Sequence, residues 1–256
     1  MKKMLSSEIV IFLLALQFLT RMPIPQNTDY SLARQTAAAR YYPLVGLLVG
    51  AISAGVFYVA SLALPVVLGV LLATAAGLLL TGAFHEDGLA DTFDGIGGGG
   101  SRERTLEIMR DSRIGAYGGA ALVLALAIKV AALAILEPRI IIIGLTAAHG
   151  LSRLSSVIVI ATSCYARSDG AGKPTADGIS APGLIVAAIT GAVCLAGLAY
   201  WLTPAAALWA AAGLVAGHVA MRAFFERKLG GYTGDALGAV QQASEIGVYL
   251  GLVAWA

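Results

Sequence analysis

The amino-acid sequence predicts an all-α fold, a polytopic integral membrane helical bundle of about seven transmembrane helices with a short N-terminal re-entrant or interfacial helix. Hydrophobic residues make up 58% of the chain, charged residues only 12%, and the mean hydropathy is +0.82, a composition unsuited to a water-soluble surface. Apolar runs of about 20 residues, the length that crosses a hydrocarbon core of about 30 Å, recur along the chain. Neither a soluble domain nor a sequence repeat is evident, so we expect one membrane domain over residues 1–256.

The first apolar stretch, residues 9–20, is too short to cross a bilayer and is followed by the helix breaker MPIP. We therefore expect a re-entrant or interfacial helix there, and, because no convincing cleavage site follows it, a retained N-terminus. The seven expected spans are 42–63, 65–84, 117–136, 139–162, 182–203, 205–225 and 236–256.

Basic residues are distributed unevenly around these spans. If the N-terminus is cytoplasmic and the spans alternate, then of 17 Lys and Arg residues only Arg139 lies outside and Lys129 and Arg153 lie within spans, which leaves the other 14 inside. This asymmetry predicts cytoplasmic connections that carry the chemistry and a C-terminus outside. A net charge of +2 without a long basic run indicates no nucleic-acid partner, and the expected partner of the apolar surface is the lipid bilayer.

The connection 85–116 is rich in acidic residues and holds seven of the 15 in the chain. Within HEDGLADTFDG, the spacing of Asp87, Asp91 and Asp94 is i, i+4 and i+7, so a helix would carry them on one face. Like charges this close repel one another unless a cation lies between them, and oxygen ligands suit Mg²⁺ or Mn²⁺ rather than zinc. We therefore predict a divalent-cation site, the alternative being a solvated helix end. Its predicted ligands in this connection are Glu86, Asp87, Asp91 and Asp94.

Glycines surround these acidic residues. Gly88 and Gly95 would let another group approach the backbone closely. The glycine run at 97–100 lacks the Gly-Lys-Ser/Thr ending of a phosphate-binding P-loop, so we interpret it as a hinge. Ser101 is placed to cap a helix that begins at Arg102.

Two further segments carry polar residues next to expected spans. MRDSRIGAYG places Arg110, Asp111 and Arg113 before the third span, where the arginines can bind phosphate or anchor the topology. GGYTGDALGAVQQASE, residues 230–245, places Asp235 at the start of the last span, either as a helix cap or as a fifth metal ligand.

A carboxylate within a span needs a partner, because an unpaired charge at membrane depth is costly. Glu245 falls within the last expected span, and we expect His149 and Arg153, one turn apart in the fourth, to be its partners, in a chemical role or as a structural clamp. We expect Lys129 to extend its amine to the membrane surface.

HEDGLADTFDG, LEIMRDSRIGAYG and GGYTGDALGA, together with FLTRMPIP and YARSDG, resemble the cobalamin synthase family, the adenosylcobinamide-GDP ribazoletransferases. The resemblance covers nearly the whole chain. It implies transfer of adenosylcobinamide phosphate from adenosylcobinamide-GDP to α-ribazole or its 5′-phosphate with release of GMP, at the cytoplasmic face of the bacterial inner membrane. It leaves open whether the chain is a monomer or a homo-oligomer.

Under this resemblance the polar residues take candidate roles in phosphoryl-type transfer, with Mg²⁺ or Mn²⁺ held by the acidic residues. The candidate catalytic residues are His85, Arg110 and Asp111. The candidate substrate-binding residues are Arg113, Arg153, Arg167 and Tyr232. Because no serine, cysteine or histidine has a recognisable nucleophile setting, we expect direct attack by the ribazole hydroxyl, with His85 or an acidic residue taking its proton.

Two other functions compete with this one. A CDP-alcohol type membrane phosphotransferase also begins its aspartate run with Asp-Gly, but typically has Ala-Arg where this chain has Ala90 and Asp91. An ion-coupled transporter would instead use Glu245, Arg153 and His149 near the middle of the membrane.

Overall fold

The computed structural model describes residues 2–24, 30–167, 173 and 176–256. Within these ranges the regular elements are helices, apart from one isolated backbone bridge between Tyr165 and Tyr232. The predicted all-α fold class is therefore confirmed.

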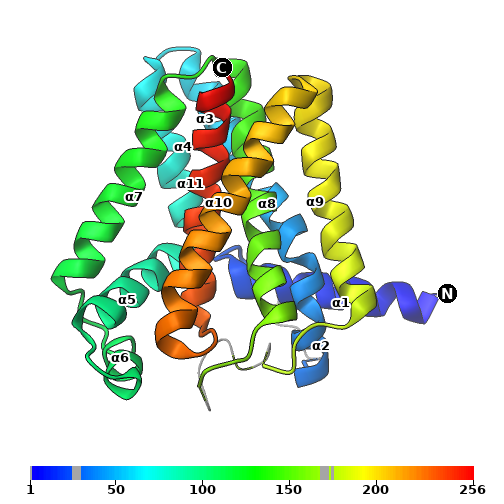
Figure 1. Cartoon of the computed structure of the whole chain (residues 1–256). Coiled ribbons are helices and arrows are strands. Elements are labelled where there is room, and N and C mark those ends of the chain that lie inside the picture. The colour runs from blue at the N-terminus through cyan, green and yellow to red at the C-terminus, as the bar shows by residue number, and fades with distance from the viewer. Residues whose placement is uncertain (1, 25–29, 168–172, 174–175) are drawn as a thin grey trace.

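Each of the seven apolar stretches predicted as a span forms a helix, and the ends differ from the prediction by at most four residues. In Figure 1 these helices run alternately up and down, so that the C-terminus lies at the end of the bundle opposite α5 and α6. They are α3 (Tyr42–Ser61), α4 (Val66–Thr81), α7 (Ala116–Ala134), α8 (Pro138–Thr162), α9 (Ala181–Trp201), α10 (Pro204–Leu229) and α11 (Gly234–Trp255).

Length and composition support a smaller number of membrane crossings than seven. Five helical stretches of the described chain are long and apolar enough to cross a membrane, or six if α4 and the helix after it form one bent span. α11 is not among them, so the number seven stays a prediction.

The chain bends sharply where α4 ends. Gly82 and Ala83 have φ angles of 66° and 55°, two consecutive residues in the left-handed region, where a helix cannot continue. α5 (Phe84–Gly98) therefore leaves α4 at 87° and runs across the lower end of the bundle.

The remaining helices lie at the same lower end (Figure 1). α1 (Lys2–Leu19) has 18 residues, more than the expected 9–20, and lies across the direction of the spans, as an interfacial helix would. α2 (Leu32–Ala38) and the short η1 (Ala39–Tyr41) lead into α3, and α6 (Arg102–Ile108) is capped by Ser101 as predicted.

Glycines allow α11 to pack at the centre of the bundle against α10, α5, α8 and α7. The backbones of α10 and α11 touch at Gly213 and Gly247, where a Cβ atom on either glycine would collide with the other helix. Small residues permit this kind of close packing in membranes. A Cβ on Gly88 of α5 would lie 2.7 Å from the carbonyl oxygen of Asp235, so α5 crosses α11 equally closely at its first turn.

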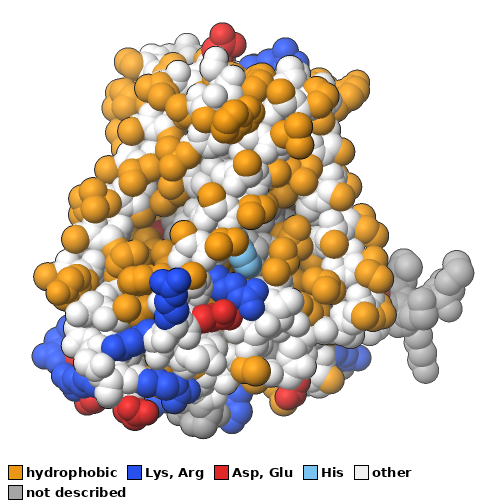
Figure 2. Space-filling view, in the orientation of Figure 1, with side chains coloured by type: hydrophobic (Ala, Val, Ile, Leu, Met, Phe, Trp, Pro, Cys, Tyr) orange, Lys and Arg blue, Asp and Glu red, His pale blue; other side chains and the backbone are white. Residues whose placement is uncertain are grey.

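Charged side chains gather at the lower end of the molecule, while hydrophobic side chains cover most of the surface above them (Figure 2). This distribution agrees with a bundle whose upper part is surrounded by lipid.

Candidate active site

The first turns of α11 and the middle of α5 bring acidic side chains from distant parts of the sequence together. Asp87 and Asp91 come from α5 and Asp235 from α11, at the crossing that Gly88 makes possible. Burial and the negative charges of Asp235 and Asp87 raise the pKa of Asp91 to about 7, although Arg167 acts in the opposite direction. We call Asp87, Asp91, Asp235 and Arg167 the acidic cluster.

Arg167 is the basic member of this cluster. Its Nη1 lies 2.9 Å from Oδ2 of Asp235, and its side chain is only 8% exposed. Its Nε and Nη2 are buried and have no hydrogen-bond partner in the described part of the chain. Two unpaired buried donors beside three carboxylates leave room for a ligand that accepts hydrogen bonds.

Backbone pairing holds Arg167 in place. The N–H of Tyr232 donates to Cys164 O at 2.9 Å, and the N–H of Ala166 donates to Tyr232 O at 2.8 Å. Tyr232 is fully buried, and its ring forms a T-shaped contact with that of Tyr165, with the ring centroids 5.4 Å apart. Of the predicted substrate-binding residues, Tyr232 therefore joins two segments that carry the site.

Two residues near the cluster have structural roles that the sequence did not reveal. Arg102 donates from Nε to Leu229 O at 2.7 Å and from Nη2 to Ala166 O at 2.8 Å, which ties α6 to the segment that carries Arg167. Thr233, and not Asp235, caps α11, because Thr233 Oγ1 accepts from the N–H of Ala236. Ser168, Asp169 and Gly170 of the YARSDG motif lie outside the described residues.

Asp94 shares the helix with Asp87 and Asp91, but its carboxylate is engaged elsewhere. Its Oδ2 accepts from the N–H of Gly115 at 2.7 Å and its Oδ1 from the N–H of Gly118 at 2.8 Å. These are donors at the start of α7, where a carboxylate stabilises the helix terminus.

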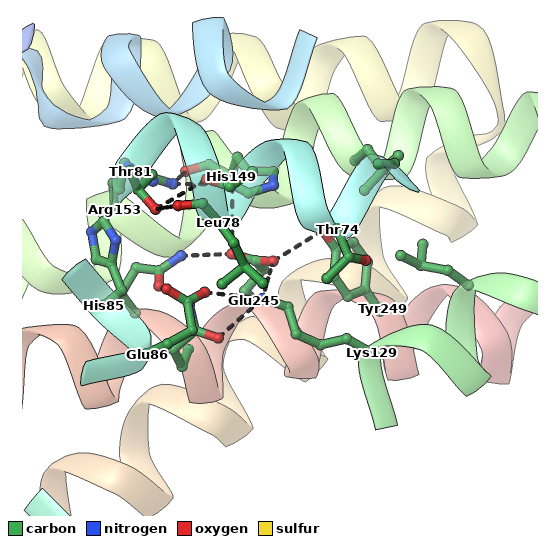
Figure 3. A pocket seen from close by; sticks show the side chains of 16 residues that line it. Thr74, Leu78, Thr81, His85, Glu86, Lys129, His149, Arg153, Glu245 and Tyr249 are labelled. Atoms are coloured by element: carbon green, nitrogen blue, oxygen red, sulfur yellow. Dashed lines mark hydrogen bonds and ion pairs between the residues drawn. The ribbon is translucent and has the colours of Figure 1, made fainter. Parts of the chain in front are cut away.

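Glu86 also has its contacts elsewhere and faces a second group of polar residues inside the bundle (Figure 3). Its Oε1 accepts from Gln242 Nε2 at 2.8 Å and lies 3.9 Å from Lys129 Nζ. A cavity of about 20 Å³, large enough for one water molecule, lies within this group. We call Glu86, Lys129, His149, Arg153, Gln241, Gln242, Glu245 and Tyr249 the buried polar cluster.

Lys129 is the main partner of Glu245, with Nζ 2.7 Å from Oε1. The expectation that Lys129 reaches the membrane surface was wrong, because the residue is buried between two carboxylates. Attraction between these opposite charges offsets part of the cost of removing them from water. Of the expected partners, His149 Nδ1 lies 3.6 Å from Glu245 Oε2. Arg153 donates from Nη1 to His149 O at 2.9 Å. The sequence feature that could have predicted the ion pair with Glu245 is the position of Lys129, a single lysine within an otherwise apolar span.

His85 is buried at the start of α5 and lines small cavities together with Arg153. The structure thus brings both residues to the interior of the bundle rather than to the acidic cluster.

Arg110, Asp111 and Arg113 lie at the surface between α6 and α7. Nη2 of Arg113 lies 2.6 Å from Oδ2 of Asp111, and the arginine side chain is 87% exposed. Hydrogen bonds from Arg113 lower the pKa of Asp111 to about 2. The described contacts do not connect this pair with Arg167 or Asp235.

The oxygen donors of the acidic cluster suit a hard cation, but the carboxylates do not form a complete metal cage. Within the described ranges, no three His, Cys, Asp or Glu side chains are arranged to hold a metal ion by themselves. Magnesium is usually bound by one or two carboxylates together with substrate phosphates and water. A shared site of that kind needs fewer carboxylates than a complete cage, and Asp87, Asp91 and Asp235 are the residues of the acidic cluster that could contribute to one.

Comparisons with known proteins agree over almost the whole chain. The family model for cobalamin-5-phosphate synthase matches residues 11–253. An adenosylcobinamide-GDP ribazoletransferase from Shewanella amazonensis is 43% identical over 254 residues, covering 96% of this chain and 95% of the relative. One from Ralstonia pickettii is 41% identical over 245 residues, covering 94% of each chain. No solved structure matches. From its length of match and identity, this chain belongs to the cobalamin-5-phosphate synthase family.

Proposed function

We propose that this protein transfers adenosylcobinamide phosphate from adenosylcobinamide-GDP to α-ribazole or α-ribazole 5′-phosphate and releases GMP. One observation carries the proposal beyond the family relationship. The motifs that resemble cobalamin synthase, which contain Asp91, Arg167 and Asp235, are far apart in the sequence but meet in one acidic cluster. We further propose that this cluster faces the cytoplasm in a bacterial inner membrane.

Arg167 is the residue best placed to bind the diphosphate of the GDP-activated substrate. Its Nη1 is held by Asp235, while Nε and Nη2 remain available to donate to phosphate oxygens. Charge-assisted hydrogen bonds from a guanidinium group to phosphate are strong and directional. Arg167 thereby orients the phosphorus atom toward the attacking hydroxyl of α-ribazole.

We propose that Asp87, Asp91 and Asp235 hold Mg²⁺ or Mn²⁺ together with that diphosphate. The metal would neutralise charge on the diphosphate and on the departing GMP. Without a cation, Asp91 is forced toward its protonated form by burial and its acidic neighbours. A carboxylate in such surroundings favours a bound cation, which removes the repulsion.

The proton of the attacking hydroxyl goes to a carboxylate of the acidic cluster rather than to His85. His85 lines two buried cavities with Arg153, and no member of the acidic cluster lines either cavity. A proton acceptor has to lie within hydrogen-bond reach of the reacting hydroxyl.

The transporter alternative is less well supported. It requires an acid in the membrane that can exchange its cation, whereas Glu245 is 1% exposed and bound by Lys129, Gln241 and Tyr249.

The test is a turnover assay of the purified protein in detergent with adenosylcobinamide-GDP, either acceptor and Mg²⁺. We expect GMP and the joined cobalamin product in equal amounts with at least one acceptor. No product with either acceptor would reject the function, whereas full turnover in excess chelator would reject only the metal site.

A further inference from the structure

A groove of about 660 Å³ runs between α3, α8 and α9, on a part of the molecule separate from the acidic cluster. Its floor is made of the buried residues Ala147, Cys194 and Leu198. Its sides include Val193 and Trp201, which are more than half exposed. The volume lies within the range of about 300–1,000 Å³ typical of ligand pockets.

The groove is longer than the hydrocarbon part of one leaflet and about as long as one leaflet with its headgroup region, about 20–22 Å. Its lining on α3 extends from Leu47 to Ser61, a distance of about 21 Å at 1.5 Å per residue. One leaflet contributes about 15 Å of hydrocarbon to a membrane core of about 30 Å. Since α3, α8 and α9 are all candidate membrane spans, we expect lipid around this groove.

Polar groups are concentrated at one end of the groove, where α8 begins and α9 ends. Arg139 is the charged residue among the described lining residues, and its Nη2 donates to Trp201 O at 2.6 Å. Tyr58 and Ser61, at the end of α3, line the same end. Arginine and aromatic side chains together are typical of the level of lipid headgroups.

We propose that this groove binds one glycerophospholipid, with an acyl chain along Ala147, Cys194 and Leu198 and the phosphate at Arg139. Two features of the lining select this occupant. The apolar floor can pack against an acyl chain, and the single guanidinium group at the headgroup level can donate hydrogen bonds to a negatively charged phosphate. The proposal is independent of the transfer reaction, because no member of the acidic cluster lines the groove.

The groove offers its own substitution test. A Cβ atom on Gly197, which lines the groove, would meet no atom of the described chain within 4 Å, so the side chain of Gly197→Leu would begin in open space at the groove and occupy part of it. Gly55 of α3 is equally open but does not line the groove. Gly55→Leu is therefore the matched control.

Trp201 at the groove serves as the reporter in a Trp209→Phe/Trp255→Phe background, since the chain has three tryptophans. The protein is titrated in dodecyl maltoside, which contains no phosphate, with phosphatidylglycerol or diacylglycerol brominated in the acyl chains. We expect saturable quenching by phosphatidylglycerol near one lipid per chain and about tenfold weaker binding of diacylglycerol, the scale of one charge-assisted contact.

Arg139→Gln should reduce phosphatidylglycerol binding to the level of diacylglycerol, and Gly197→Leu should remove saturable quenching, while Gly55→Leu should leave it unchanged. Size-exclusion elution and turnover confirm that each variant is folded. Quenching that is unsaturable, equal for the two lipids, or unaffected by Arg139→Gln would overturn the proposal. So would a dimer, detected by cross-linking, that dissociates in Gly197→Leu and excludes lipid from the wild-type groove.

Discussion

Asp91 and Glu86 lie on the same helix, yet their surroundings indicate different roles. Glu86 is buried, accepts a hydrogen bond from Gln242 and lies 3.9 Å from Lys129, so its nearest partners are inside the bundle, although its Oε2 has no hydrogen-bond partner in the described chain. Asp91 is beside Asp87 and Asp235 with Arg167 as the nearby positive charge, and its pKa is raised to about 7. Carboxylates that the protein leaves in mutual repulsion are typical of functional sites.

We predict that Asp91→Asn and Asp235→Asn each reduce kcat/KM for α-ribazole by about 10²–10³-fold, the scale of losing one preorganised electrostatic group. The substitutions keep the side-chain volume and remove a charge that would hold the cation. Steady-state assays on membrane-inserted protein, normalised to the amount of folded chain, provide the measurement.

Glu107→Gln is the matched control for these variants. Glu107 lies on the neighbouring α6, is 68% exposed and pairs with Arg104 at the surface. Its activity should stay within about twofold of wild type, because exposed pairs contribute little. Equal losses in Glu107→Gln and Asp91→Asn would mean that the assay detects general damage to this end of the protein.

Sequence spacing identified the acidic residues of α5 but could not predict which neighbouring helix each side chain contacts. It correctly placed Asp87, Asp91 and Asp94 on one helix, since HEDGLADTFDG forms α5. It could not show that α7 begins beside Asp94, or that Glu86 points toward Lys129, because both contacts depend on the packing of separate helices. The role proposed for Arg167 came from the family resemblance and not from spacing.

At the scale of elements, apolar length predicted the seven long helices well, because each run of about 20 residues is a strong signal. The bend between α4 and α5 was not predicted. The expected span 65–84 passed through Gly82 and Ala83, and the left-handed conformation of Ala83 has no sequence signature. That bend is what turns α5 across the bundle and brings its aspartates to α11.

The buried polar cluster joins α5, α7, α8 and α11, and we predict that its charges are mutually dependent. Lys129→Met should lower the free energy of unfolding by about 3–5 kcal/mol, because it leaves Glu245 buried without its cation. The double variant Lys129→Met/Glu245→Gln should recover most of this loss, since both charges are removed. Thermal unfolding in detergent gives the comparison, and a double variant no more stable than the single one would contradict charge pairing as the cause.

The contact between α10 and α11 gives a second prediction at this scale. Gly247→Ala should destabilise the protein by about 1–3 kcal/mol, because its Cβ would enter the backbone of α10 at Gly213 and overpack the contact. Gly55→Ala, whose Cβ meets nothing within 4 Å in the described chain, should be neutral or slightly stabilising. Equal thermal midpoints for the two variants would show that α10 and α11 separate easily.

At the scale of the whole molecule, the charge distribution and the helix directions give the same orientation. Charged side chains gather at the end that carries the acidic cluster, and the C-terminus lies at the opposite end (Figures 1 and 2). If basic residues remain in the cytoplasm, the acidic cluster is cytoplasmic and the C-terminus is outside.

Whether α11 crosses the membrane decides this topology, because α11 is not apolar enough to be identified as a span by composition. Its packing supplies the reason to expect a crossing. α11 touches α10 from Gly217 beside Ala243 to Trp209 beside Gly251, so it follows a candidate span over much of its length. Its polar residues Gln242 and Glu245 are buried against other helices and do not have to face lipid.

We therefore predict opposite results for reporters fused after Lys228, at the end of α10, and after Ala256, at the end of α11. Green fluorescent protein should be fluorescent after Lys228 and dark after Ala256, while alkaline phosphatase should be inactive after Lys228 and active after Ala256. The two fusions differ only by the segment that contains α11, so each is the control for the other. The same reporter active at both positions would show that α11 does not cross, and would leave an even number of crossings with both termini on one side of the membrane.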